Sequence, residues 1–214
     1  MKILKQSTTK NGNKIELIGN DNHKNILIIG VFHGDEPQGK YLIDKYLKNE
    51  SPLLFIPCLN PDGMNKNSRT NANGVDLNRN FPTKNWGQNK GENATCDDDT
   101  TAYYGGTAPA GEIETKFLIE VLNEYKPEII LTLHAPYKVV NYDGPAKELA
   151  EKISEIIKYP VEASIGYPTP GSFGTYAGVE RGIKTITLEL DETSSVEELY
   201  KPVHKIFDML CNIL

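Results

Sequence analysis

The sequence predicts an α/β fold, a mixed and mostly parallel central sheet with helices on both faces. Short apolar runs of strand type alternate along the chain with segments whose apolar residues recur at helical spacing. The strand-type runs are apolar at nearly every position, which is typical of strands covered on both faces. A length of 214 residues suits one core, so residues 1–214 are predicted to form a single domain.

The first third of the chain predicts strand, helix, strand and turn in that order. Residues 25–32 form a β-branched apolar run, and residues 36–47 follow with apolar side chains at helical spacing after an early proline. A second apolar run covers residues 53–57. It leads into Asn-Pro-Asp-Gly at residues 60–63, whose composition predicts a turn.

A long Asn-rich stretch then extends to residue 106 with few apolar anchors. Loops of this length inside a compact domain are uncommon unless they are functional, so we expect a site here. Within it, residues 85–106 are compatible with a lid over the site and equally with a solvated linker.

Regular elements resume after this stretch and alternate. They are a helix at 112–126, a strand at 129–133, a helix at 146–157, a strand at 183–190 and a helix at 196–214. Pro127 ends the first of these helices, and Pro202 is expected to kink or split the last one.

Composition excludes several classes of partner. The formal net charge is −6, which disfavours nucleic acid and anionic membrane surfaces as partners. The sequence contains no run of about 18 apolar residues, and its amino terminus is polar, so we expect a cytoplasmic protein. Three widely spaced cysteines, Cys58, Cys96 and Cys211, suggest neither a disulfide framework nor a cysteine metal site.

Two histidines and a glutamate form a candidate metal site. His33 and Glu36 follow the predicted strand at 25–32, and His134 follows the strand at 129–133. Ligand sites of open α/β sheets lie outside the carboxyl ends of the strands, which would bring the three together. Two histidines and one glutamate are a ligand set that leaves a fourth position on zinc open. A single histidine after a strand is more often structural, so the combination carries the prediction.

Glu189 is a carboxylate within an otherwise apolar predicted strand. If the strand is central, burial would raise the pKa of Glu189 and suit it to proton transfer. The alternative is an edge strand that turns Glu189 to solvent.

Two arginines, Arg69 and Arg79, lie in the polar segment of residues 69–82. Leu77 and Phe81 can anchor this segment, which would hold the arginines at a fixed separation. Guanidinium groups bind carboxylates through paired hydrogen bonds, so the segment suits an anionic substrate. A solvated loop with surface arginines is the alternative.

Together and in this order, the motifs resemble the zinc carboxypeptidase (M14-type) family over nearly the whole chain. The motifs are His33-x-x-Glu36, Asn60-Pro61-Asp62-Gly63, Arg69, Asp76-Leu77-Asn78-Arg79-Asn80, His134 and Glu189. Within the family, residues 69–82 and 166–174 resemble the murein peptide amidase A branch. The resemblance implies an α/β/α sandwich fold.

The resemblance also implies roles at the metal centre. His33, Glu36 and His134 would bind one Zn²⁺ ion, and Asp76 would orient His33. Glu189 would act first as general base and then as general acid.

Further roles concern the substrate. Arg69 would stabilise the oxyanion of the tetrahedral intermediate, and Asn78 and Arg79 would bind the carboxylate beside the cleaved amide. Tyr167 would cap the substrate, with Tyr176 as the competing candidate.

The predicted function is zinc-dependent hydrolysis of the amide bond that releases a carboxy-terminal amino acid from a small peptide bearing a carboxylate. The murein peptide amidase branch acts in cell-wall recycling and releases meso-diaminopimelate from its γ-D-glutamyl bond. An N-acyl amino acid deacylase of the aspartoacylase or succinylglutamate desuccinylase type is an alternative, although residues 60–63 and 169–174 argue against it. A non-catalytic metal- or peptide-binding module is a further alternative. The sequence predicts no oligomeric state.

Overall fold

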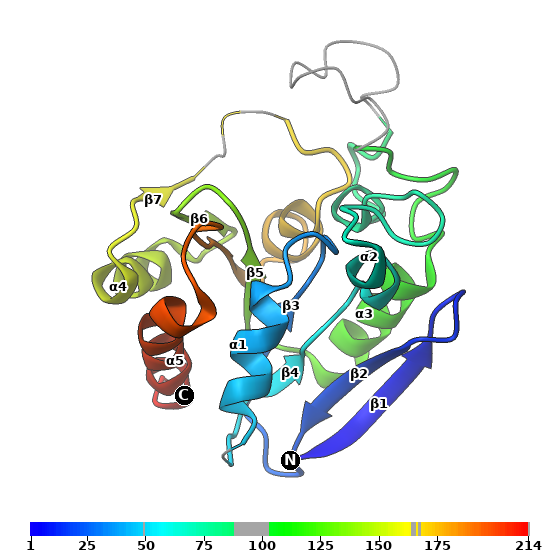
Figure 1. The fold of residues 1–214 in the computed structure, drawn as a ribbon. Coiled ribbons are helices and arrows are strands. Elements are labelled where there is room, and N and C mark those ends of the chain that lie inside the picture. The colour runs from blue at the N-terminus through cyan, green and yellow to red at the C-terminus, as the bar shows by residue number, and fades with distance from the viewer. Residues whose placement is uncertain (49, 88–102, 164–165, 167, 214) are drawn as a thin grey trace.

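The computed structural model describes residues 1–48, 50–87, 103–163, 166 and 168–213, in which one eight-stranded sheet carries helices on both faces (Figure 1). The strands are β1 (Lys2–Thr8), β2 (Lys14–Gly19), β3 (Ile26–Gly30), β4 (Leu54–Ile56), β5 (Ile129–His134), β6 (Val139–Asp143), β7 (Val161–Glu162) and β8 (Lys184–Glu189). The helices are α1 (Gln38–Tyr46), α2 (Pro61–Lys66), α3 (Ile113–Tyr125), α4 (Lys147–Ile157) and α5 (Val196–Cys211), with a 3₁₀ turn η1 (Leu77–Arg79) and a π-helical segment η2 (Gly174–Val179). The predicted fold class is confirmed.

The sheet is mixed, with a parallel centre. The strand order is β1-β2-β4-β3-β5-β8-β6-β7, and the four central strands β4, β3, β5 and β8 run parallel. The hairpin β1–β2 lies antiparallel on one side, and β6 pairs antiparallel with β8 on the other. The carboxyl ends of β3, β5 and β8 therefore meet at one edge of the sheet, the usual place for a site in such folds.

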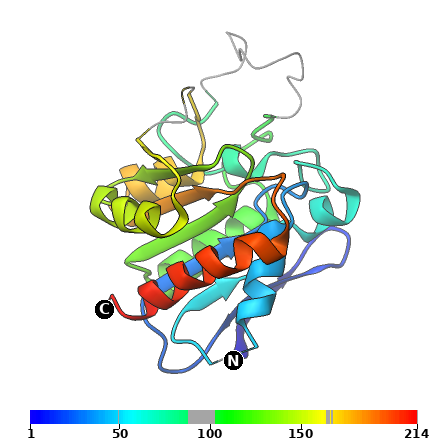
Figure 2. The same ribbon diagram turned by 60° about the vertical axis from the view of Figure 1, so that its left-hand side comes forward.

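Helices cover both faces of the sheet (Figures 1 and 2). An apolar cluster lies between the sheet and the helices on each face. On one face Ile28 and Leu131 pack in a cluster with Phe207 from α5, together with side chains of α1 and α4. On the other face Ile29 and Ile130 pack with side chains of α3 and η2. Successive residues of a strand point to opposite faces, so the continuous apolar runs of β3 and β5 serve both layers.

Some elements differ from the sequence prediction. Residues 60–63, predicted as a turn, begin helix α2: the Asn60 side chain accepts a hydrogen bond from the Gly63 amide at 2.9 Å, and Pro61 is the first helical residue. Both features are typical of helix starts as well as of turns. Helix α5 runs unbroken from Val196 to Cys211, so Pro202 does not split it.

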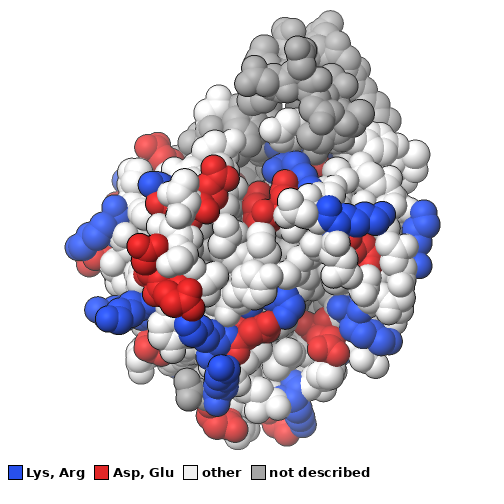
Figure 3. Space-filling model, viewed as in Figure 1, with Lys and Arg blue, Asp and Glu red and all other residues white. Residues whose placement is uncertain are grey.

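The remaining expectations concern the surface charge, the cysteines and membrane-spanning helices. Acidic and basic side chains are interspersed over the face shown in Figure 3. Cys58 and Cys211 are both free, and Cys96 lies outside the described residues. None of the helices in the described part of the chain is long and apolar enough to cross a bilayer.

Candidate metal centre

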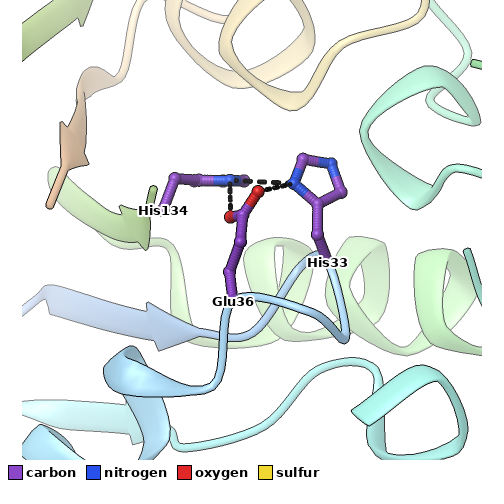
Figure 4. A group of neighbouring side chains, drawn as sticks. All are labelled: His33, Glu36 and His134. Carbon is purple, nitrogen blue, oxygen red and sulfur yellow. Dashed lines mark hydrogen bonds and ion pairs between the residues drawn. The ribbon is translucent and has the colours of Figure 1, made fainter. Parts of the chain in front are cut away.

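Three side chains converge at the carboxyl edge of the central strands. His33 lies three residues beyond β3, Glu36 precedes α1, and His134 ends β5, the neighbour of β3. The Nδ1 atom of His33 lies 2.7 Å from Oε1 of Glu36, and Nδ1 of His134 lies 3.0 Å from Oε2 of the same carboxylate (Figure 4). The two Nδ1 atoms are 3.3 Å apart, and all three side chains are buried. The predicted trio is therefore assembled.

This trio fits a tetrahedral metal ion. Each residue offers one ligand atom, and these atoms lie within 4.8 Å of one another. Metal–nitrogen bonds of about 2.0–2.1 Å give a tetrahedron edge of about 3.3–3.4 Å, which agrees with the 3.3 Å between the two imidazole nitrogens. Two imidazoles and a carboxylate are also the donor types that zinc prefers.

Asp76 holds the outer side of His33. The Nε2 atom of His33 lies 3.2 Å from Oδ1 of Asp76, a fully buried carboxylate. Burial alone would lower the pKa of His33, but the charges of Glu36 and Asp76 outweigh it and raise this pKa to about 9. An acceptor at Nε2 fixes the ring orientation and leaves Nδ1 directed toward the trio.

Arg69 joins the network of charged groups around Asp76 and Glu36. Its Nε and Nη2 atoms lie 3.1 and 3.0 Å from Oδ2 of Asp76, and Nη1 lies 3.7 Å from Oε1 of Glu36. The Asp76 carboxylate is thus shared between His33 and Arg69. Burial acts against its ionisation, but the positive charges of Arg69 and His33 keep the pKa of Asp76 well below its usual range.

Asn78 and Arg79 are held by η1. The backbone N–H of Asn78 donates to Oδ1 of Asp76 at 2.8 Å, so this carboxylate also caps the 3₁₀ turn. The Asn78 side-chain oxygen accepts a hydrogen bond from the backbone N–H of Phe173 at 2.8 Å. Nη1 of Arg79 donates to the Asn78 carbonyl at 2.7 Å, and Arg79 is buried. The predicted carboxylate-binding pair therefore lies on the same short turn as Asp76.

Glu189 stands opposite His134 in the paired strands β5 and β8. Strand β8 has neighbours on both sides, and Glu189 is only 6% exposed, so the edge-strand alternative is wrong. Its Oε2 atom is buried and has no hydrogen-bond partner among the residues that the structure describes. Burial raises the pKa of Glu189, while the histidines of the trio act in the opposite direction. A carboxylate in this state suits proton transfer.

Two sequence expectations depend on residues outside the described part of the chain. Tyr167 is one of these residues, and so are residues 88–102, which make up most of the predicted lid or linker. Tyr176, the competing candidate to Tyr167 for capping the substrate, is described. Its hydroxyl accepts a hydrogen bond from Arg181 at 2.7 Å, and the centre of its ring lies 5.5 Å from that of Phe81. These contacts engage Tyr176 within the protein.

Tyr103 is a neighbour of the site that the sequence analysis did not identify. The guanidinium carbon of Arg69 lies 5.0 Å from the centre of the Tyr103 ring, and that of Arg79 lies 5.5 Å from it. One aromatic ring thus contacts both arginines by cation–π interaction. Its position 24 residues beyond Arg79 gave no periodic or motif signal.

Asn60 joins two loops of the site. Its side-chain nitrogen donates to the carbonyls of Phe32 and Arg69 at 3.3 and 3.4 Å, while its oxygen caps α2. The residue before His33 and the oxyanion-binding candidate Arg69 therefore share one amide group. This explains physically why the Asn-Pro-Asp-Gly segment accompanies the site motifs.

Comparison with known sequences gives consistent matches. Residues 1–148 match the family model of zinc carboxypeptidases. Murein peptide amidase A of Escherichia coli strain K12 is 33% identical over 193 residues, which cover 86% of this chain and 78% of that protein. The protein of the same name from Vibrio campbellii is 32% identical over 182 residues, covering 79% and 70% respectively.

Solved structures agree with this. The crystal structure of murein-tripeptide amidase from Escherichia coli O157 superposes with a TM-score of 0.80 at 28% identity and covers 95% of this chain and 89% of that one. Thrombin activatable fibrinolysis inhibitor superposes with a TM-score of 0.70 at 17% identity, covering 99% of this chain and 70% of that one. At that identity the likeness concerns the fold alone.

Proposed function

The chain belongs to the zinc carboxypeptidase family and is a hydrolytic enzyme, and from this premise we propose that it hydrolyses murein peptides with zinc as cofactor. The finer proposal is that it releases meso-diaminopimelate from γ-D-glutamyl-diaminopimelate. The observation that carries the proposal of zinc-dependent hydrolysis is the buried trio His33, Glu36 and His134 beside Glu189, whose Oε2 atom has no partner in the described part of the chain. The curated relatives named murein peptide amidase A support the substrate class.

The substrate carboxylate is proposed to bind at η1. Arg79 offers a guanidinium that is held by the carbonyl of Asn78, and Asn78 offers an amide that is held by the backbone N–H of Phe173. Diaminopimelate presents a carboxylate beside the cleaved amide, as a peptide carboxyl terminus does. Binding there would hold the amide in one orientation near the trio.

Zinc is proposed to be held by His33, Glu36 and His134. When bound, it would act as a Lewis acid and lower the pKa of a water molecule to about 7. Glu189 accepts one proton from the attacking water, whose oxygen forms the new bond to the carbonyl carbon. The same proton then passes to the leaving nitrogen as the carbon–nitrogen bond breaks. A raised pKa suits Glu189 to both steps.

Arg69 is proposed to stabilise the negative charge that develops on the carbonyl oxygen. Its guanidinium is fixed on Asp76 and lies 3.7 Å from the trio carboxylate. Because it is held before substrate arrives, it needs little reorganisation during the reaction. We also propose that residues 1–214 form one catalytic domain and that the enzyme acts in the cytoplasm on recycled murein peptides.

The test is product analysis with purified protein and a panel of substrates. The panel contains murein tripeptide, γ-D-glutamyl-diaminopimelate and acylated amino acids, each with and without a chelator and with zinc restored afterwards. The proposal expects chelator-sensitive release of diaminopimelate. Release of acetate or succinate from the acylated amino acids would favour a deacylase, and zinc binding without hydrolysis of any panel member would favour a binding module.

A further inference from the structure

A pocket of about 290 Å³ lies where the polar segment of residues 69–82 meets the start of α3. Its polar walls are Lys10 from the β1–β2 hairpin, Asn71 and Asn73 from the polar segment, and Glu112 and Glu114 from the start of α3. None of the eight residues that line it belongs to the metal trio or to the residues proposed to bind substrate. Pockets for small molecules begin at about 300 Å³, so this one suits a ligand of few heavy atoms.

Asn71 holds the acidic wall of the pocket together. Its side-chain oxygen accepts hydrogen bonds from the backbone N–H groups of Asn73 at 3.0 Å and Val75 at 3.1 Å. Its side-chain nitrogen donates to Oε2 of Glu112 at 2.8 Å and to Oε2 of Glu114 at 3.3 Å. Both donors and both acceptor positions of this amide are therefore used, and the two carboxylates are fixed beside each other before any ligand arrives.

The charged groups of the pocket lack partners of opposite charge. No ion pair joins Lys10, Glu112 or Glu114 to another residue in the described ranges. On both glutamates Oε2 accepts the side-chain hydrogen bonds, and no described side chain donates to Oε1. Glu114 is nevertheless only 3% exposed. A carboxylate this deeply buried is normally paired, so we expect a positively charged ligand group beside it.

The surroundings of Glu114 disfavour its negative charge. Burial raises the pKa of Glu114, and the charges of Glu112 and Asp62 act in the same direction. Hydrogen bonds from Asn71 and from the backbone N–H of Glu114 itself oppose this rise. An ammonium group beside the two glutamates would offset both the burial and the repulsion.

Lys10 supplies the opposite charge on the other side of one amide group. Its Nζ atom donates to Oδ1 of Asn73 at 2.6 Å, and Nδ2 of Asn73 donates to Oε2 of Glu112 at 2.7 Å. The amide of Asn73 thus separates a cation from an anion. An α-amino acid carries its ammonium and carboxylate groups on one carbon atom, so each can face the opposite charge of the pocket. Ile113, which is 40% exposed and also lines the pocket, offers apolar surface to a small side chain.

We propose that this pocket binds a free α-amino acid with a small side chain, whose ammonium group donates to Glu112 and Glu114 and whose carboxylate is bound by Lys10. The site is separate from the metal centre, and the inference does not rest on the proposed function. An amino acid bound here would contact Asn71 in the same segment that carries Arg69 and Asp76.

The experiment titrates the zinc-loaded protein with three matched probes and follows backbone amide signals by NMR. L-alanine carries both charges, lactate replaces the ammonium group by a hydroxyl, and alaninol replaces the carboxylate by a hydroxymethyl group. Alanine should give saturable shifts at Asn73 and Gly111, which line the pocket. Lactate should bind about 10- to 100-fold more weakly, the value of a charged hydrogen bond. Alaninol should bind about 2- to 5-fold more weakly, because Lys10 is exposed.

Two variants separate the two ends of the ligand. Glu114→Gln should lower the affinity for both alanine and alaninol by about 10- to 100-fold. Lys10→Met should lower the affinity for alanine by about 2- to 5-fold and leave that for alaninol unchanged. Glu155→Gln, an exposed change in α4, should change neither. Circular dichroism would verify that Glu114→Gln is folded, and the exposed position of Lys10 keeps the test decisive if it is not.

Three outcomes would overturn the pocket site. Alanine shifts confined to the amides around His33 and His134 would place the amino acid at the metal centre alone. Equal affinities for alanine and lactate, or an unchanged alanine affinity in a folded Glu114→Gln, would remove the pairing with the glutamates. Saturation by calcium ions with no response to alanine would assign the carboxylates to a metal ion instead, since calcium prefers oxygen ligands.

Discussion

His134 and Glu189 stand directly opposite each other where the parallel strands β5 and β8 end. His134 is a candidate ligand of the metal trio, and Glu189 is the proposed base. Because both lie in paired strands, main-chain hydrogen bonds of the sheet set their separation. Groups held by strands are positioned more precisely than groups on loops. This pairing makes Glu189 the first residue to test.

Replacing Glu189 by glutamine should lower kcat by about 10²–10⁴-fold, the usual contribution of a general acid–base group, with little change in zinc content. The melting temperature should not fall, because burial disfavours the carboxylate that is removed. Glu155→Gln, an exposed change in α4, serves as the control. Turnover near the wild-type value in Glu189→Gln would assign the proton transfer to another group.

Replacing Asp76 by asparagine should weaken zinc binding by about 10- to 100-fold, the usual effect of losing a hydrogen-bonded partner of a metal ligand. The amide keeps an oxygen that can cap η1 but loses the charge facing His33 and Arg69. Competition with a chromogenic chelator measures the affinity. The matched control is Asp62→Asn, a buried carboxylate that accepts hydrogen bonds from Thr9 and Asn13. It should lower stability and leave zinc affinity unchanged; equal zinc affinity in both variants would contradict the role of Asp76.

Replacing Tyr103 by leucine should reduce kcat/KM, because the ring contacts both arginines. Cation–π contacts of about 0.5–2 kcal/mol correspond to a loss of about 2- to 30-fold. Tyr103→Phe keeps the ring and should restore most of the activity. A loss of the same size in both variants would mean that the hydroxyl group, and not the ring, matters.

Gly34 lies where two segments of the site meet, and Gly34→Ala should destabilise the protein. A Cβ atom there would lie 2.0 Å from the carbonyl carbon of Gly63, a backbone atom that cannot rotate away. Overpacking costs about 1–3 kcal/mol, which lowers the melting temperature by several degrees in a chain of this length. The neighbouring exposed change Asp35→Ala is the control. An unchanged melting temperature for Gly34→Ala would show that the two backbones can separate without loss.

The metal trio was predictable because its residues follow strands that the sequence marks clearly. Continuous apolar runs identify β3 and β5, and parallel neighbours bring His33, Glu36 and His134 to one edge. The composition of residues 69–82 indicated Arg69 as a binding residue, but its specific role and the role of Asp76 came only from the family resemblance, since nothing in the spacing of the two residues indicates that they form a hydrogen bond with each other.

Other features lacked a local signal. Strand β1 contains lysines and is exposed or half-buried throughout, so it shows no apolar run. Tyr103 contacts two arginines of the site, Arg69 and Arg79, that are far from it in sequence. Such contacts depend on how loops cross the sheet edge, which periodicity does not report.

The raised pKa of Asp143 predicts a dependence of stability on pH that Asp143→Asn should remove. Burial raises this pKa from 3.8 to about 6, and no charged group facing Asp143 from η2 or β8 contributes to the shift. The folded state therefore binds the proton more tightly than the unfolded state does. The stability that protonated Asp143 contributes is greatest below about pH 4, falls as the pH rises through about 6, and is lost above it.

Denaturant unfolding of the wild type and of Asp143→Asn between pH 4 and pH 7.5 measures this difference. The variant should gain stability relative to the wild type as the pH rises from 4 to about 6.5, after which the gap should stay constant. Subtracting the two curves cancels the titration of groups such as His33 that both proteins share. Asp44→Asn should give no such gap, because its carboxylate is exposed. A flat difference for Asp143→Asn would mean that the Asp143 carboxylate is solvated in the folded protein.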